Sequence, residues 1–395
     1  MSTESRKESK LYLRSKEATA GTEDAYDFFE TSSAIMTKPP STSLKESNLG
    51  KLGAGEFGTK QETQAIYTPF TVKVSRLSEF LYFMSFFQGK EDSMRIVDAG
   101  NKVFSHLLDH LAITSRTLPT FTAFYSDGST IHAMKHCIIS DFSFTLAAGG
   151  NGVIDATFNG FCNMHKDNSG SLAKDTVATG WSSGEYTTIV AAESLINYKG
   201  CVMFMGSATE AVPLVHANVA YGSSNLTGSE IITPFVNSLT VTGNNGITAE
   251  DSLRASGGGV LNNQERKDFA YTLEMQVRKD DTLPATTYDA MFLADTQRAI
   301  EIGWLGKTIK DAHRYGLDIV FPVVQLSDVK EDDESPINQT LSYTVFANTS
   351  AQAFQVFGQT KVGIRYNASH GTDSSSSQSA SVSSSSLGLS SSSST

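Results

Sequence analysis

The sequence predicts a mainly β fold of the α+β class, organised as two tandem β-sandwich or barrel modules that each carry a short flanking helix. Three observations lead to this fold. Apolar and polar residues alternate in many short runs, turns rich in Gly and Asn separate those runs, and the same order of elements occurs in both halves. Alternation with a period of two is typical of strands with one buried face. We therefore expect antiparallel hairpins to dominate the chain.

The first half contains the clearest hairpins. Residues 142–146 alternate between apolar and polar, and a second alternating run begins at Val153. The turn between them contains Asn151-Gly152, which tolerates positive φ at both positions and so favours a tight hairpin. Residues 126–129 form a similar turn signal. The expected strands of this half are 70–74, 121–125, 137–146 and 153–161.

Two segments of the first half have helical periodicity. Apolar residues at 77, 80, 81, 84 and 87 recur at three- and four-residue spacings, which predicts a helix over 77–87 with Ser78 as its N-cap. A similar spacing of Val103, Leu107, Leu108 and Leu111 predicts helix within residues 97–111. One short helix beside a sheet fits a β-sandwich module better than a parallel α/β fold.

The second half repeats this order, with a short apolar segment at 288–294 in place of the first helix. The expected strands are 236–242, 271–277, 300–305, 317–326 and 341–347. Internal repetition usually indicates a module that is used many times around an axis or along a line. We therefore predict two modules, residues 63–215 and 216–368, that superpose on one another.

The two ends of the chain lack these patterns. Residues 1–62 are polar and charged without a period, which predicts a flexible N-terminal arm. Residues 369–395 are nearly all serine, and such a segment cannot bury enough apolar surface to offset the entropy lost on ordering. We therefore predict a disordered C-terminal tail.

Composition limits the function classes. The chain has 31 Lys and Arg against 42 Asp and Glu, a net charge of −11. This balance argues against a protein that grips double-stranded DNA and fits a surface that must not retain nucleic acid. With no secretory signal and no apolar run long enough to cross a bilayer, we expect a soluble protein made inside the cell, without a membrane partner.

Candidate metal ligands gather in the first half without a suitable spacing. His132, His136, Cys137, Cys162 and His165 invite a zinc site. On a strand the first two histidines would share a face about 13 Å apart, too far to bind one ion. Cys137, Cys162 and the third cysteine, Cys201, have no paired spacing, so we expect buried free thiols in a reducing compartment.

Two further segments have structural explanations. Gly257-Gly258-Gly259 lacks the Lys-Ser/Thr of a P-loop and the spacing of a dinucleotide site, which predicts a flexible loop. The acidic run at 330–334 lacks the glycine and spaced ligands of an EF-hand, which predicts a solvated hairpin tip. We therefore predict no catalytic residue, no metal site, no cofactor and no enzymatic activity.

The order of strands and turns resembles that of the tail tube proteins of long-tailed bacteriophages. One group of segments runs from Leu118-Pro119-Thr120-Phe121-Thr122 through residues 136–144 to 149–158. The other runs from residues 234–245 through 266–277 to Leu317-Asp318-Ile319-Val320-Phe321-Pro322. The resemblance covers about residues 65–366 and concerns strand order, turn placement and dipeptide composition.

This resemblance implies a structural virion protein, made in the host cytoplasm and assembled into the phage tail. Modules of this family join side by side into rings, and the rings stack into a tube through which the genome leaves. A duplicated chain implies homotrimeric, pseudo-six-fold rings, with homohexameric rings as the other arrangement. The implied partners are further copies of the chain, other tail proteins, and genomic DNA that passes through the lumen without specific binding.

Two other functions remain open from the sequence. One is a surface-displayed β-sandwich binding module, such as a baseplate, fibre or carbohydrate-binding protein, which predicts exposed aromatic platforms. The other is an enzyme, which requires His132, His165 and Asp155 to gather around a bound metal ion.

Overall fold

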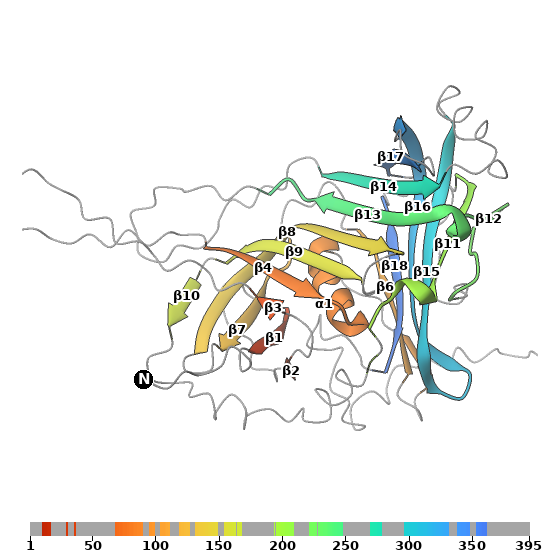
Figure 1. Cartoon of the computed structure of the whole chain (residues 1–395). Coiled ribbons are helices and arrows are strands. Elements are labelled where there is room, and N and C mark those ends of the chain that lie inside the picture. The colour runs from red at the N-terminus through yellow and green to blue at the C-terminus, as the bar shows by residue number, and fades with distance from the viewer. Residues whose placement is uncertain are drawn as a thin grey trace, which may run out of the picture.

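A computed structural model gives the arrangement of the chain (Figure 1). It describes residues 10–16, 29–30, 35–36, 68–89, 95–98, 103–110, 118–126, 131–148, 154–162, 164–167, 193, 195–208, 221–226, 228–247, 269–278, 296–331, 338–347 and 353–361, and every structural statement below concerns these residues. The predicted mainly β class is confirmed. All strand pairings among the described residues are antiparallel, and one α-helix accompanies them.

One layer of the sheet follows the predicted hairpins. Each strand pairs with the next in the order β3 (Ile35–Met36), β4 (Thr68–Val74), β9 (Asp155–Cys162), β8 (Ile131–Ala147), β13 (Val236–Asn244), β14 (Ala270–Arg278) and β17 (Asn338–Phe346). The predicted hairpin across Asn151-Gly152 is confirmed by the β8–β9 pairing, although residues 149–153 lie outside the described residues. Core side chains alternate along β13, β14 and β17, as their sequences predict.

A second layer is built around the longest strand, β16 (His313–Glu331). In order, its strands are β12 (Glu230–Ile231), β11 (Cys201–Ser207), β15 (Gln297–Lys310), β16, β18 (Gln355–Thr360), β6 (Val103–Leu108) and β5 (Arg95–Asp98). On the side away from β15, β16 pairs first with β18 and then, beyond Pro322, with β17. Pro322 lies at a register shift opposite β15, where a residue without an N–H is tolerated.

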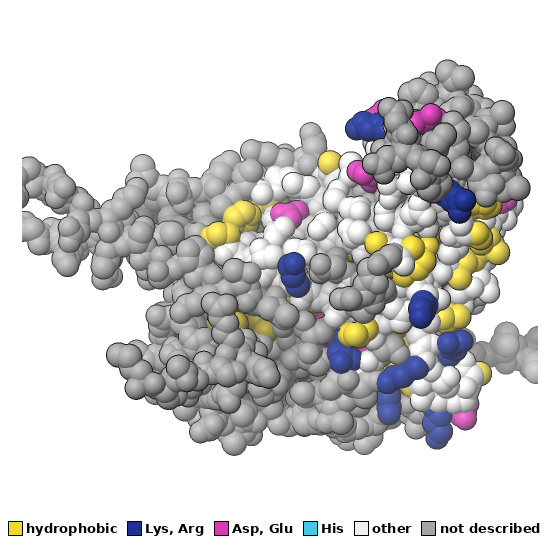
Figure 2. Space-filling model, viewed as in Figure 1, with side chains coloured by type: hydrophobic (Ala, Val, Ile, Leu, Met, Phe, Trp, Pro, Cys, Tyr) yellow, Lys and Arg dark blue, Asp and Glu magenta, His cyan; other side chains and the backbone are white. Residues whose placement is uncertain are grey.

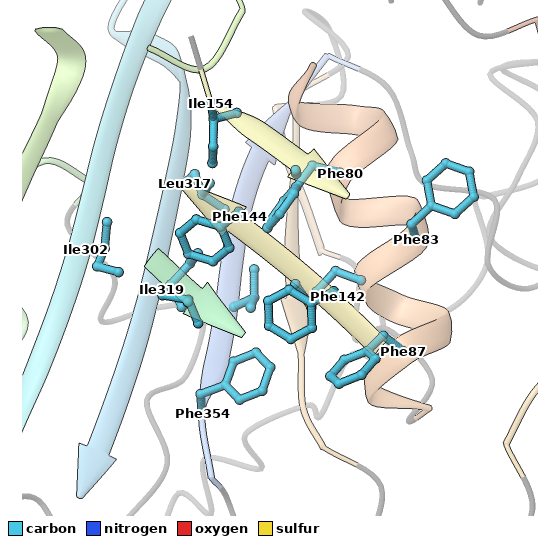
Figure 3. Packing of buried hydrophobic residues seen from close by; sticks show 14 of the residues in the cluster. Phe80, Phe83, Phe87, Phe142, Phe144, Ile154, Ile302, Leu317, Ile319 and Phe354 are labelled. Carbon is cyan, nitrogen blue, oxygen red and sulfur yellow. The ribbon is translucent and has the colours of Figure 1, made fainter. Parts of the chain in front are cut away.

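Helix α1 (Leu77–Gln88) is enclosed between the two layers, where it contacts β8, β6 and β18. Its 12 residues are all buried. Phe80 packs edge-on against Phe144 of β8 at 6.0 Å between ring centroids, and Phe87 packs against Phe142 at 4.6 Å. Figure 3 shows Phe83 on the opposite side of the helix, where its ring lies 5.5 Å from that of Phe158. A helix with apolar side chains on opposite sides requires such burial.

The start of α1 differs from the sequence prediction. Arg76, not Ser78, occupies the N-cap position, and its side chain makes no capping hydrogen bond. The backbone N–H of Ser78 instead donates to Glu193 Oε2 at 3.1 Å, and the Ser78 hydroxyl donates to Glu193 Oε1. The predicted Ser78 cap is therefore wrong, because a carboxylate 115 residues away satisfies the free N–H group.

The predicted helix within residues 97–111 is also wrong. The chain forms β5 and β6 here, and all six residues of β6 are buried. A strand buried on both faces has no period of two, and in β6 even Ser105 and His106 are buried, so spacing alone cannot distinguish it from a buried helix.

A smaller sheet holds part of the N-terminal arm. β1 (Lys10–Lys16) pairs with β7 (Phe121–Ser126) and with β2 (Phe29–Glu30), and it buries Leu11 and Leu13. β7 also pairs with the start of β8, which pairs with β10 (Met164–Asp167). The rest of the arm, the apolar segment 288–294 and the serine-rich tail lie outside the described residues.

Four strand pairings of the described residues cross the boundary between the predicted modules 63–215 and 216–368. β8 pairs with β13, β6 pairs with β18, and β11 pairs with both β12 and β15. Hydrogen bonding is therefore continuous from one half of the chain to the other. Whether the halves superpose stays a prediction.

Candidate functional site

The β15–β16 hairpin is the most prominent charged feature of the second layer. Its strands have 14 and 19 residues, and they meet at a turn in which Asp311 has φ 51°. Asp tolerates this left-handed conformation better than most residues. Lys307, Lys310 and Arg314 are exposed beside the turn. Figure 2 shows Lys and Arg side chains gathered at this end of the hairpin, at the lower right. We call these three residues the basic tip.

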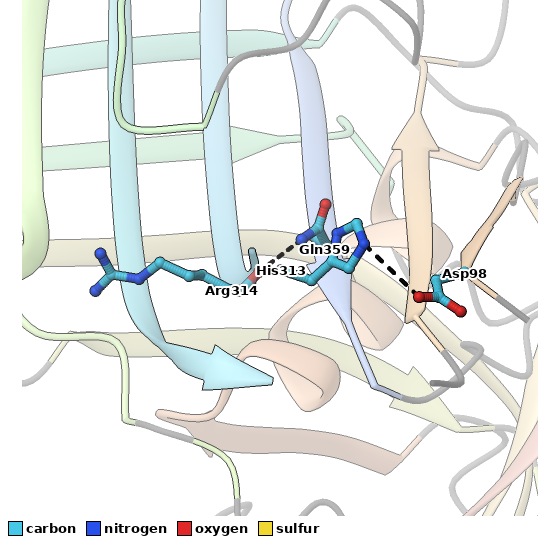
Figure 4. Close-up of polar contacts among 4 residues, drawn as sticks. All are labelled: Asp98, His313, Arg314 and Gln359. Carbon is cyan, nitrogen blue, oxygen red and sulfur yellow. Dashed lines mark hydrogen bonds and ion pairs between the residues drawn. The ribbon is translucent and has the colours of Figure 1, made fainter. Parts of the chain in front are cut away.

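The basic tip is anchored to neighbouring strands. Arg314 Nε donates to the Gly306 carbonyl at 2.9 Å, across the hairpin. Gln359 of β18 donates from Nε2 to the Arg314 carbonyl at 2.8 Å, and His313 Nε2 lies 3.9 Å from Asp98 Oδ2 of β5 (Figure 4). The exposed side chains of the basic tip therefore project from a hairpin backbone that these contacts hold against β18 and β5.

Positive charge at this tip contrasts with the net charge of −11. The three cations outnumber Asp311, the carboxylate of the turn. Charges at an exposed tip attract opposite charge at distances up to about one Debye length, near 8 Å at physiological salt. The basic tip can therefore contact an acidic protein surface or a phosphate group.

The opposite end of β16 forms the predicted acidic hairpin. Glu331 pairs with Gln339 of β17, and Lys330 and Glu331 are exposed. Lys330 Nζ lies 3.3 Å from Asp328 Oδ2. The predicted hairpin is confirmed to this point, and residues 332–334 of the acidic run lie outside the described residues.

The candidate metal ligands do not converge. His132 and His165 lie on the paired strands β8 and β10, opposite Asp167 and Met134 respectively. Asp155 pairs with Thr145, 13 residues along β8 from His132, or about 40 Å in an extended strand. The backbone therefore places Asp155 at the other end of β8 from His132 and His165. Within the described ranges, no three His, Cys, Asp or Glu side chains are placed to hold a metal ion.

His136 lies at an irregularity in β8. Its φ is 57°, and the register with β7 shifts beside it. This shift interrupts the alternation that we expected to place His132 and His136 on one face. It occurs where β8 leaves the smaller sheet and joins the main one. A bulge is a common way to redirect a strand between sheets.

The predicted buried free thiols are confirmed at Cys137, Cys162 and Cys201, and the reducing compartment stays a prediction. Burial raises the pKa of the Cys201 thiol to about 12, so this side chain stays neutral. Gly257-Gly258-Gly259 lies outside the described residues.

Sequence reasoning missed the basic tip, although a signal for it existed. Lys307, Lys310 and Arg314 surround Asp311 within eight residues, directly after an alternating run that ends near Leu305. Charges that flank the turn of an expected hairpin indicate an exposed tip.

No protein-family model and no curated protein sequence matches this chain. None of its described helices has the length and hydrophobicity needed to cross a bilayer.

Proposed function

We propose that this protein is a structural subunit that assembles into stacked rings and forms a phage tail tube, the channel for genome delivery. The observation that supports this most is the edge of the second layer at β12. Among the described residues β12 is the last strand of that layer and pairs on one side only, with Phe204 and Met205 of β11. Ile231 of β12 is 58% exposed there.

An open edge with an apolar residue is normally covered or blocked, because its free backbone groups pair with other strands. Joining edges around a ring covers each of them with a neighbouring subunit and closes the sheet into a barrel. The continuous sheet through β8–β13 and β6–β18 gives each subunit a rigid body for such contacts. Two modules per chain favour trimeric, pseudo-six-fold rings, with hexameric rings as the other arrangement.

Charge supports the same function. A net charge of −11 reduces adhesion of DNA to the tube wall. The basic tip is then a contact for acidic surface of another copy of the chain. The alternative, a surface-displayed binding module, predicted exposed aromatic platforms. Among the large hydrophobic side chains exposed in the described residues, Phe346 is the aromatic one, beside Val97, Leu195 and Ile231.

Assembly of the purified chain tests the proposal. We expect rings or tubes with a central channel in negative-stain images, and a concentration-dependent large species in sedimentation velocity. Ile231→Asp places a charge on the open edge and should abolish the large species. Phe346→Asp, which changes another exposed apolar residue, serves as the control and should assemble. A wild-type chain that stays monomeric at the highest concentration reached would contradict the proposal.

A further inference from the structure

Two carboxyl groups are buried together in the middle of the β15–β16 hairpin. Glu301 and Asp318 have no exposed surface. Asp318 lies opposite Gly303, and Glu301 lies opposite Val320, so the two acids are diagonal neighbours on one face of the sheet. Ile302 and Ile319 point to the other face, into the main core.

Residues 221–226, which we call the covering segment, close over this face. Tyr221 and Leu226 pack with Ala299, Val320 and Phe357 in a separate apolar cluster. Two glycines make room for this arrangement. A Cβ at Gly316 would lie 2.7 Å from the Tyr221 ring, and one at Gly303 would lie 2.7 Å from Asp318 Oδ1.

Glu301 holds the covering segment through hydrogen bonds. Its Oε2 accepts from the Asn225 backbone N–H at 2.8 Å and from the Ser224 hydroxyl at 3.4 Å. Its Oε1 accepts from the Asn225 side-chain amide. These donors favour the ionised form of Glu301, although burial raises the pKa of this carboxyl.

Asp318 differs from Glu301 in its hydrogen bonding. Neither of its oxygens makes a hydrogen bond of normal geometry within the described residues, although the side chain is fully buried. Burial, and then the neighbouring charge of Glu301, raise the pKa of Asp318 well above its ordinary value, and the nearby Gly222 N–H offsets only part of this. A second negative charge in such a place is strongly unfavourable.

Other ionisable groups on this face do not neutralise the pair. Arg314 lies four residues along β16, about 13 Å away in an extended strand, and bonds to Gly306. Asp109 Oδ1 accepts from Gln355 of β18, and the Tyr221 hydroxyl bonds to Ser105 of β6. From β11, the residues paired with Gly303 and Glu301 are Val202 and Phe204, which carry no charge.

We propose that Glu301 and Asp318 share one proton, and that this proton is the condition for keeping the covering segment closed on the sheet. Asp318 carries the proton, and Glu301 stays ionised under its three donors. Two buried carboxyl groups that are diagonal neighbours titrate as a pair, and the last proton of the pair leaves to solvent as pH rises. Loss of that proton leaves two adjacent buried charges, and the covering segment opens to hydrate them. We call this proton-dependent closure of the covering segment the latch. It acts within one subunit and does not depend on ring formation.

Hydrogen exchange of the covering segment, followed by mass spectrometry from pH 6 to pH 10, tests the latch after correction for the intrinsic pH dependence of exchange. We expect wild-type protection to fall at alkaline pH. Asp318→Asn mimics the protonated carboxyl and should keep protection at alkaline pH, by at least about tenfold over wild type, the equivalent of one pKa unit. Asp328→Asn is the matched control, because Asp328 is an exposed aspartate of the same strand, and it should behave like wild type.

Three results would overturn the proposal. The first is protection in Asp318→Asn that falls with pH as in wild type. The second comes from Glu301→Gln, which removes the neighbouring charge and lowers the pKa of Asp318 under the closed segment, so the loss of protection should end at lower pH and be smaller in total. A loss as large as that of wild type contradicts proton sharing, even if Asp318→Asn folds poorly. The third is restoration of wild-type protection at pH 9 by Ca²⁺ or Mg²⁺, because the pair is then a cation site.

Discussion

The tip and the middle of the β15–β16 hairpin carry charge in opposite ways. Lys307, Lys310 and Arg314 project into solvent around the turn, whereas Glu301 and Asp318 have no exposed surface. An exposed charge keeps its hydration and acts at a distance, with little effect on stability. A buried carboxyl must obtain donors or a proton from the protein. The same two strands therefore present one charged region for contacts and another that constrains the fold.

Glu301→Ala should give the largest effect on this comparison. The change removes the carboxylate that accepts hydrogen bonds from the Asn225 backbone N–H and side-chain amide. Loss of hydrogen bonds to a charged group, from donors that are partly buried, should lower the free energy of unfolding by about 2–3 kcal/mol. Urea denaturation measures this change. Glu274→Ala, at an exposed glutamate of β14, is the control and should change it by less than about 0.5 kcal/mol.

An equal decrease in the free energy of unfolding of Glu301→Ala and Glu274→Ala would contradict the expected difference between buried and exposed carboxylates. If Glu301→Ala lowers the free energy of unfolding but leaves hydrogen exchange of residues 221–226 unchanged, Glu301 does not hold the covering segment.

The pH dependence of stability should give the next largest effect. The folded protein holds a proton on Asp318 that the unfolded chain releases near its ordinary pKa of 3.8. The free energy of unfolding therefore falls as pH rises from that value toward the raised pKa. Asp318→Asn removes this contribution, so its stability should fall less than that of wild type. Thermal unfolding at a series of pH values measures the difference.

Glu193 also makes the free energy of unfolding fall as pH rises, and its contribution must be separated from that of Asp318. Burial raises the pKa of Glu193 from 4.5 to about 7, against the hydrogen bonds from Ser78. Its contribution to the slope ends near pH 7, where the folded protein also releases this proton. The comparison between wild type and Asp318→Asn is therefore made above pH 7. If stability falls with pH equally in wild type and Asp318→Asn above pH 7, groups other than Asp318 cause that decrease.

The sequence predicted elements in which local pattern reports burial directly. β13, β14 and β17 alternate because one face is in the core, and the helical spacing of Phe80, Met84 and Phe87 predicted α1. β6 was mistaken for helix because burial on both faces removes the period. The cap of α1 could not be predicted either, since Glu193 is 115 residues from Ser78.

The basic tip and the buried acidic pair also differ in whether a local sequence pattern indicates them. The basic tip follows from charges around an expected turn, so the sequence contained its signal. Glu301 and Asp318 occupy the polar positions of alternating runs, as solvent-facing residues do. Only packing of the covering segment, about 75 residues from Glu301 in sequence, makes this face an interior. Burial that depends on a distant segment leaves no local pattern to read.

The smallest expected effect on stability comes from neutralising the basic tip. Lys307→Gln, Lys310→Gln and Arg314→Gln together should change the free energy of unfolding by less than about 0.5 kcal/mol per residue, because exposed charges keep their hydration when folded. The same triple variant should self-associate more weakly than wild type at low salt. At high salt the two should match, because salt screens the attraction between the basic tip and acidic surface in wild type. Sedimentation velocity at two salt concentrations measures this. Lys73→Gln, a cation exposed on β4 far from the tip in sequence, is the control for a general change in net charge. Equal weakening by the control would assign the effect to net charge, and marked destabilisation of the triple variant would mean that the tip, like the middle of the hairpin, contributes to the fold.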